Sequence, residues 1–198
     1  MLKISNILAS SSPRRKKLLE KIGLSFSIEE SNVVEKLTLD LPPHKIAKHW
    51  AREKAKNVST NNINSIVIGA DTIVNFENFV FGKPKNEEES IKMLKFLSGK
   101  THQVITGVSL IYDSLNMEYT FHNLTQVTFQ SYGEEEILQY IETEKPYDKA
   151  GSYGIQDSFA KHVQSINGCY YNVVGLPLSS FYYFYKKLNE KIKGYEDS

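Results

Sequence analysis

Short apolar runs along the chain alternate with longer stretches in which apolar residues recur every three or four positions. The short runs predict strands, and the helical spacing predicts helices. We expect strands at residues 4–9, 25–29, 65–70, 79–81, 102–112, 118–131 and 169–174. We expect helices at residues 13–22, 43–59, 87–97, 133–143, 159–165 and 177–192. This alternation, with two long strands in succession, indicates an α/β fold with a mixed central β-sheet flanked by helices.

The length and charge of the chain narrow its class. A chain of 198 residues suits one domain that covers residues 1–198. Lys and Arg number 24 against 23 Asp and Glu, so the net charge is only +1. Proteins that bind nucleic-acid polymers usually carry a basic excess, which this chain lacks. The near-zero net charge does not exclude a small nucleotide that binds in a local basic pocket.

Cysteine content and hydropathy indicate the cellular setting. Cys169 is the single cysteine, so no disulfide can form within the chain, and we expect a cytoplasmic protein. Residues 4–9 are too short for the apolar core of a signal peptide. No apolar run approaches the roughly 18–20 residues that span a bilayer, so we expect no membrane partner.

The junction at residues 8–15 reads Leu-Ala-Ser-Ser-Ser-Pro-Arg-Arg. Proline is favoured at the first helical position, and a serine before it can cap the first turn. Free backbone N–H groups, hydroxyls such as that of Ser10, and the guanidiniums of Arg14 and Arg15 therefore meet in one place. Such a combination suits a phosphate chain. An ordinary helix start with two solvated arginines explains the same residues equally well.

Asp71 follows the apolar run at residues 65–70. We expect it at the carboxyl edge of the sheet, where open α/β sheets usually bind ligands. A carboxylate in that place can ligate Mg²⁺ or accept a proton from water. The alternative is an aspartate that serves a turn or a cap.

Two lysines are candidates for phosphate contacts. Lys83 lies between a glycine and a proline that fix the chain direction, although an ordinary surface turn has the same composition. Lys54 and Arg52 are two positions apart on an expected helix, so they point in different directions. One of them can face a site while the other faces solvent, and a fully solvated pair is the alternative.

The segment at residues 148–156 has two glycines and an alanine, so its backbone can approach a ligand closely. Gln156 offers a donor and an acceptor that can pair with the edge of a base, and Tyr153 can stack or hydrogen-bond. A glycine-rich connector is the alternative. The sequence contains no phosphate-binding loop of the Walker type, no dinucleotide-binding glycine motif and no zinc-ligand spacing.

Taken together, these segments resemble the Maf family of nucleotide pyrophosphatases. The resemblance runs from Leu8 to about Leu178, with its motifs in the order of the family. The strongest matches are at residues 10–15, 69–72, 82–84, 101–108, 148–156 and 172–178. The resemblance implies an ITPase-like fold with two lobes and a cleft between them.

The resemblance also implies a reaction and the residues that carry it. Members hydrolyse nucleoside triphosphates to the monophosphate and pyrophosphate with a divalent metal cation, Mg²⁺ or Mn²⁺. Asp71 would accept the proton of the attacking water, and Glu35 would be the second carboxylate near the metal. The phosphate-binding residues would be Ser10, Arg14, Arg15, Lys54 and Lys83. A homodimer is what the family suggests.

The family's specificity positions fall at Arg14, Thr72 and Gln156, where this chain resembles the branch that acts on dTTP and UTP. Asp157 is a departure, because the family often has a glycine after the glutamine. Two alternatives remain: a pyrophosphatase for 7-methyl-GTP or another modified nucleotide, and a nucleotide-binding regulator of septum formation with weak catalysis.

Overall fold

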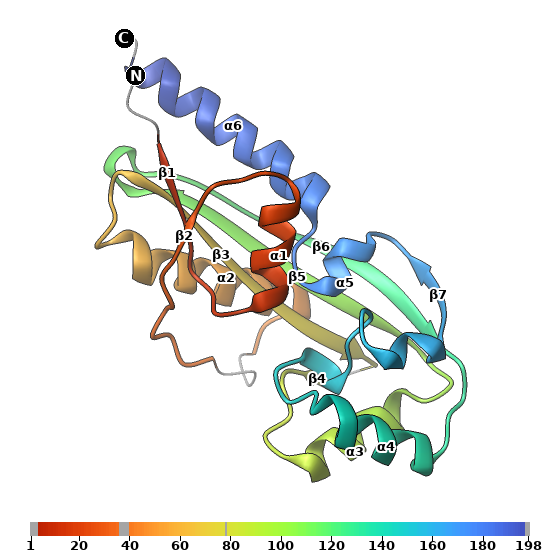
Figure 1. Ribbon diagram of the computed structural model, residues 1–198. Helices are drawn as coiled ribbons and strands as arrows, with labels where there is room; N and C mark the ends of the chain where they lie inside the picture. Colours follow the sequence, from red (N-terminus) through yellow and green to blue (C-terminus); the bar gives the residue numbers. More distant parts are fainter. Residues whose placement is uncertain (1–3, 36–39, 78, 197–198) are drawn as a thin grey trace.

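The computed structural model describes residues 4–35, 40–77 and 79–196. Within these residues, seven strands form one sheet in the order β2-β1-β3-β5-β6-β7, and β4 pairs beside β3 (Figure 1). The strands are β1 Ser5–Leu8, β2 Ser27–Ile28, β3 Ser65–Phe76, β4 Phe79–Phe81, β5 Thr101–Tyr112, β6 Met117–Phe129 and β7 Val163–Asn167. β1 pairs in parallel with β2 and β3, whereas the pairings of β3 with β4 and β5, of β5 with β6 and of β6 with β7 are antiparallel. The expected mixed sheet is confirmed.

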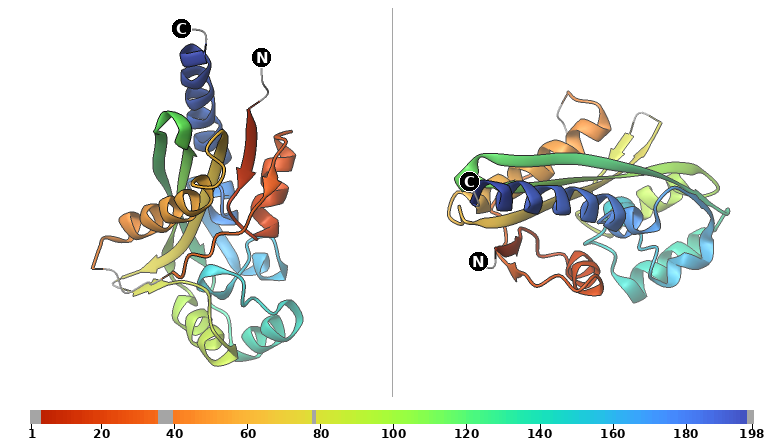
Figure 2. Two further views of the ribbon diagram at one scale, coloured as in Figure 1. Left: turned by 90° about the vertical axis from the view of Figure 1, so that its left-hand side faces the viewer. Right: turned by 90° about the horizontal axis from the view of Figure 1, so that it is seen from above.

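Helices cover both faces of the sheet. They are α1 Pro13–Lys21, α2 Pro43–Ser59, α3 Glu87–Leu97, α4 Glu134–Glu144, α5 Tyr170–Val174 and α6 Leu178–Glu196. Three 3₁₀ turns are η1 Asp113–Leu115, η2 Ala150–Ser152 and η3 Ser158–His162. α2 lies on one face, and α1, α5 and α6 lie on the other, while α3 and α4 pack together near one end of the sheet (Figure 2). None of the described helices has the length and apolar character needed to cross a membrane.

The long strand β3 has an uncovered stretch along one edge. On that edge β1 pairs with β3 only as far as Ile68, and β4 pairs with β3 only from Val74 onward. On the opposite edge β5 pairs with β3 continuously, from Val67 to Asn75. The sheet is therefore complete on one side of β3 and open on the other between its partners β1 and β4, and Asp71 is at the centre of this opening.

Two glycines let α2 lie directly on the backbone of the sheet. A Cβ on Gly69 would be 2.2 Å from the carbonyl oxygen of Ala51, and one on Gly107 would be 2.2 Å from that of Ala47. Gly107 is also the residue that pairs with Asp71 across β3 and β5. The close approach at these glycines sets how far α2 stands from the strand that carries Asp71.

Three expectations from the sequence were wrong in detail. The strand expected to end at residue 70 continues to Phe76 because β5 pairs with it throughout, so Asp71 is inside a strand and not at a carboxyl edge. Residues 169–174 form helix α5 and not a strand, because an apolar run alone does not separate a buried strand from a buried helical turn. Residues 159–165 divide between η3 and β7.

The core at the start of β5 is aromatic and contains a buried histidine. His102 on β5 packs against Phe129 and Tyr153, and its Nε2 lies 2.8 Å from the Tyr153 hydroxyl. Its Nδ1 is buried and has no hydrogen-bond partner in the part of the chain that the structure describes. Burial lowers the pKa of His102 to about 4, so the imidazole is neutral in the folded protein near neutral pH.

Gly107→Ala should lower the free energy of unfolding by about 1–3 kcal/mol, because the new methyl group would push α2 off the sheet. Urea denaturation measures this change. Gly194→Ala on the exposed side of α6 is the matched control, since no contact within 4 Å is found for its Cβ position among the described residues, and Ala in a helix should not lower the free energy of unfolding. Equal stability of the two variants would contradict the close packing of α2.

The pKa of His102 also predicts how stability depends on pH. The folded value of about 4 lies below the unfolded value of about 6.5, so between them the unfolded chain binds a proton that the folded chain does not. The free energy of unfolding should therefore fall by up to about 3 kcal/mol from this group as the pH drops from 6.5 to 4. Urea titrations of wild type and His102→Gln should show a smaller fall in the variant. Parallel curves would refute the assignment.

Candidate active site

A cavity of about 240 Å³ opens where the edge of β3 is uncovered. It lies between the β1–α1 junction on one side and the residues that precede α3 and follow α4 on the other. Every site residue predicted from the sequence lines it: Ser10, Arg14, Arg15, Glu35, Lys54, Asp71, Thr72, Lys83 and Gln156. Segments far apart in the sequence therefore meet around one opening, which agrees with the expected cleft.

The β1–α1 junction has the capping geometry that its sequence predicts. Pro13 begins α1, and Ser12 is the N-cap, whose hydroxyl accepts a hydrogen bond from the backbone N–H of Arg15 at 3.4 Å. The Ser10 hydroxyl accepts one from the N–H of Ser12 at 3.2 Å. The start of α1 therefore faces the cavity with its positive end, which favours an anion.

The Arg15 guanidinium connects three segments of the cavity wall. Its Nε donates to the carbonyl oxygen of Gly175 at 2.9 Å, and its Nη1 and Nη2 donate to the hydroxyls of Ser10 and Thr72 at 3.1 and 3.0 Å. Burial lowers the pKa of Arg15 from its ordinary value, and the negative charge of Asp71 opposes this shift. These three hydrogen-bond partners among the described residues are neutral, so the Arg15 guanidinium can still attract an anion in the cavity.

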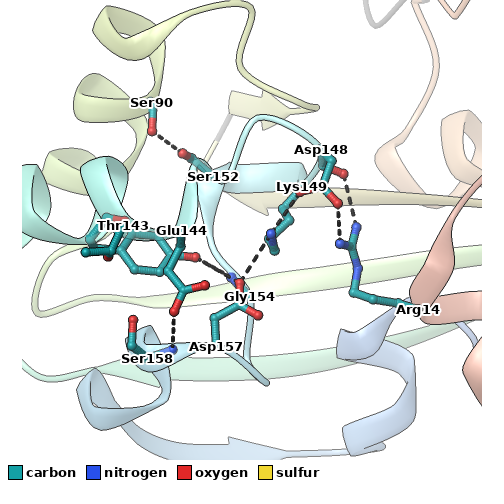
Figure 3. A network of polar contacts seen from close by, with 11 residues as sticks. Arg14, Ser90, Thr143, Glu144, Asp148, Lys149, Ser152, Gly154, Asp157 and Ser158 are labelled. Carbon is teal, nitrogen blue, oxygen red and sulfur yellow. Dashed lines mark hydrogen bonds and ion pairs between the residues drawn. The ribbon is translucent and has the colours of Figure 1, made fainter.

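Arg14 contacts the opposite wall. Its Nη1 donates to Asp148 Oδ2 at 2.5 Å and its Nη2 to the Asp148 carbonyl oxygen at 3.0 Å (Figure 3). Burial alone would raise the pKa of Asp148, but hydrogen bonds from Lys149 and Arg14 outweigh it and lower the value. Asp148 therefore stays ionised as the partner of Arg14, a role that the sequence pattern did not indicate.

Lys54 lies between two carboxylates. Its Nζ is 2.7 Å from Asp71 Oδ1 and 2.5 Å from Glu35 Oε1, and both Lys54 and Asp71 are buried. Arg52 instead points outward and pairs with Glu118 at 2.9 Å. The predicted divergence of the two side chains is confirmed, and Lys54 is the one that faces the site.

The second oxygen of Asp71 has the properties of a base. Asp71 Oδ2 is buried and has no hydrogen-bond partner among the described residues. Burial raises the pKa of Asp71 and the charge of Glu35 adds to the shift, while Lys54 opposes it. Burial alone would also raise the pKa of Glu35, but Lys54 outweighs it and lowers the value. The two carboxylates thus differ in basicity, and Asp71 is the stronger base.

Lys83, Thr72 and Gln156 complete the cavity wall. Lys83 is exposed after β4, and among the described residues it has no hydrogen bond or ion pair, although its charge helps to lower the pKa of Glu35. The Thr72 hydroxyl is hydrogen-bonded to that of Thr106 at 3.0 Å. Gln156 is exposed in a turn that borders the opening. Lys83 and Gln156 are therefore available to a ligand.

Asp71 and Glu35 fit a divalent cation only in combination with other ligands. Among the described residues, no group of three or more His, Cys, Asp or Glu side chains could hold a metal ion. The unpartnered Asp71 Oδ2 is an oxygen donor of the kind that Mg²⁺ prefers, and Mg²⁺ often binds one or two carboxylates plus substrate phosphates and water. The donor set therefore fits a cation that arrives with a phosphate-bearing ligand.

Two buried residues support the site from behind its walls. Tyr153 hydrogen-bonds to His102 through its hydroxyl, which is the second of the two roles that the sequence allowed. Asn172 is buried on α5, where its amide donates to the Val104 carbonyl oxygen and the Thr125 hydroxyl. A polar residue inside an apolar run was the only available signal for Asn172.

Comparison with known proteins identifies the family of the chain. The family model described as Maf-like protein matches residues 5–188. The chain belongs to the Maf family. Its relatives include proteins named dTTP/UTP pyrophosphatase from Bacillus cereus, 49% identical over 92% of this chain and 95% of the relative, and from Bacillus pumilus, 48% identical over 87% and 90%. A HAM1 protein from Coxiella burnetii shows a likeness too weak to bear on fold or function, with TM-score 0.43 and 14% identity over 64% of this chain and 73% of that one.

Arg15→Lys should lower the free energy of unfolding by about 1–3 kcal/mol, because an ammonium cannot reach three oxygen atoms on three segments as the guanidinium does. Chemical denaturation tests this expectation. Lys17→Ala, an exposed position on the same helix of this Maf protein, should change stability by no more than about 0.5 kcal/mol. If Arg15→Lys were as stable as Lys17→Ala, the bridging role of Arg15 would be wrong.

Proposed function

We propose that this chain is a nucleoside triphosphate pyrophosphatase that hydrolyses dTTP and UTP to the monophosphate and pyrophosphate. The observation that carries the proposal is the unpartnered, buried Asp71 Oδ2 in a cavity whose walls carry Arg14, Arg15 and Lys83. A base beside several cations is the arrangement that hydrolysis of a polyanion needs. Relatives named dTTP/UTP pyrophosphatase, about half identical over most of their length, support the choice of substrate.

The reaction assigns a separate task to each wall of the cavity. Arg15, Lys83 and the start of α1 bind the phosphate chain and offset charge that builds on the leaving group. A water molecule attacks the α-phosphorus, the bond from that phosphorus to the bridging oxygen breaks, and pyrophosphate leaves. Asp71 accepts the proton of the water, which its raised pKa favours.

The position of Lys54 explains how Asp71 can take up that proton. Protonation neutralises Asp71 and would leave a buried ammonium without that partner, which is costly. Glu35, 2.5 Å from the same ammonium, keeps Lys54 paired while Asp71 is neutral. We therefore propose that Lys54 controls which of the two carboxylates, Asp71 or Glu35, is ionised. This role is in addition to the phosphate contact that the resemblance implies.

Glu35 and Asp71 would hold the divalent cation, Mg²⁺ or Mn²⁺, together with substrate oxygens. When bound, the cation would offset phosphate charge and polarise the reacting centre. Gln156 would read the base edge through its amide, with Arg14 and Thr72 at the other specificity positions. A homodimer and a cytoplasmic location stay predictions.

Asp71→Asn should reduce pyrophosphate release from dTTP and UTP by about 10²–10⁴-fold, because the amide cannot take a proton from water. Release by wild type should rise as the pH passes upward through the raised pKa of Asp71, since only the ionised carboxylate is a base. Steady-state assays with Mg²⁺ and with Mn²⁺ measure both effects.

Asp113→Asn is the control for this variant. Asp113 pairs with Lys56, which is two residues after Lys54 on α2, at 2.5 Å, and this pair does not border the cavity. Its activity should match wild type. Near wild-type turnover in Asp71→Asn would exclude Asp71 as the base. Faster hydrolysis of 7-methyl-GTP than of dTTP and UTP would exclude the proposed substrate, and nucleotide binding without pyrophosphate release would favour the regulatory alternative.

A further inference from the structure

Asp157, directly after Gln156, has contacts that the proposed reaction does not use. Its Oδ2 lies 3.3 Å from Lys149 Nζ and accepts a hydrogen bond from the Tyr140 hydroxyl at 3.2 Å. Only about a fifth of its side chain is exposed, at 19%. The Asp157 carboxylate is therefore enclosed by two partners beside the candidate base-reading residue.

The first effect of Asp157 is on the turn that presents Gln156. The Asp157 N–H donates to the Gly154 carbonyl oxygen at 3.2 Å, which closes a four-residue turn with Gln156 at its third position. The Tyr140 oxygen accepts the N–H of Gly154 at 3.0 Å. Because the Tyr140 hydrogen is donated to Asp157, the oxygen lone pairs stay available for Gly154. The Asp157 carboxylate is thus connected through Tyr140 to the first residue of the turn, which the Asp157 backbone N–H closes.

Packing on Gly154 makes this arrangement tight. A Cβ on Gly154 would lie 2.1 Å from Asp157 Oδ2, so the carboxylate rests directly against the first residue of the turn. Burial raises the pKa of Tyr140 above its ordinary value, and Asp157 adds to the shift. The Tyr140 hydroxyl therefore stays protonated and able to donate.

The second effect is a row of alternating charges that reaches across the cavity (Figure 3). Lys149 Nζ is 2.8 Å from Asp148 Oδ1, and Asp148 Oδ2 is 2.5 Å from Arg14 Nη1. The row reads Asp157, Lys149, Asp148, Arg14, and its formal charges cancel. It begins beside Gln156 and ends at Arg14, so it connects two of the three predicted specificity positions.

We propose that Asp157 is a positioning residue for nucleotide selection, which holds the Gln156 turn through Tyr140 and Gly154 and holds Arg14 through Lys149 and Asp148. Without the carboxylate, Lys149 would keep Asp148 as its one ion-pair partner among the described residues and would compete with Arg14 for it. The row would also gain one net positive charge, which attracts any triphosphate whatever its base. Loss of Asp157 therefore weakens discrimination between bases more than it weakens binding of phosphate. This inference rests on the proposed function.

Three variants separate the two effects. Asp157→Gly removes both of them, and Asp157→Asn keeps an acceptor for Tyr140 but removes the charge. Tyr140→Phe breaks the connection to Gly154 while the row of charges stays intact. The matched control is Glu142→Gln, because Glu142 is an exposed carboxylate on the same helix as Tyr140 and has no hydrogen bond or ion pair among the described residues.

The measurement is kcat and KM for pyrophosphate release from dTTP and from dGTP, with thermal unfolding as a check that each variant folds. In Asp157→Gly, the ratio of kcat/KM for dTTP to that for dGTP should fall about 5- to 10-fold, mainly through a higher KM for dTTP. Asp157→Asn and Tyr140→Phe should each show part of this fall. Glu142→Gln should keep the wild-type ratio.

Binding of the non-hydrolysable α,β-methylene analogues of dTTP and dGTP, measured by calorimetry, separates this inference from the proposed function. A wild-type preference for the dTTP analogue that Asp157→Gly loses supports the role of Asp157, whether or not turnover is detected. An unchanged preference in folded Asp157→Gly and Tyr140→Phe, or a fall in kcat that is equal for both nucleotides, overturns it. A wild-type protein that turns over dTTP with an unaltered ratio in every variant leaves the proposed function standing and removes this inference alone. Wild-type protein that binds neither analogue overturns both.

Discussion

The ammonium of Lys54, shared by Asp71 and Glu35, is the interaction on which the candidate site depends. A buried carboxylate is costly unless a nearby cation compensates its charge, and Lys54 Nζ lies 2.7 Å from Asp71 Oδ1. The same geometry leaves Asp71 Oδ2 without a hydrogen-bond partner among the described residues. The ion pair with Lys54 thus offsets the free-energy cost of burying the Asp71 carboxylate. It also leaves one carboxylate oxygen available to a ligand.

Two features of the fold place this ion pair in an accessible site. α2 must approach β3 closely, and Gly69 and Gly107 permit this because a side chain at either position would clash with the backbone of α2. The edge of β3 must also be open at Asp71, and it is, since β1 ends its pairing at Ile68 and β4 begins at Val74. The site is consequently a gap at one edge of β3, and residues from both faces of the sheet line it.

The sequence predicted the composition of the site better than its geometry. The junction before Arg15 and the position of Lys54 on a helix have strong local signals, in a proline at the first helical position and in helical spacing. The extension of β3 through Asp71 depends on pairing with β5, which is distant in sequence, so the residues predicted a strand end there. The bridging of Arg14 by Asp148, 134 positions away, has no local signal either. Apolar residues at 169–174 predicted a strand, because burial in a short helix produces the same composition.

The proposed reaction requires that water attack the α-phosphorus of a pyrimidine nucleoside triphosphate. Hydrolysis of dTTP in ¹⁸O-labelled water, followed by mass spectrometry of both products, determines which phosphorus is attacked. We expect one labelled oxygen in the monophosphate and unlabelled pyrophosphate. Label in pyrophosphate, or release of orthophosphate in its place, would show that water attacks elsewhere and would refute the proposed reaction.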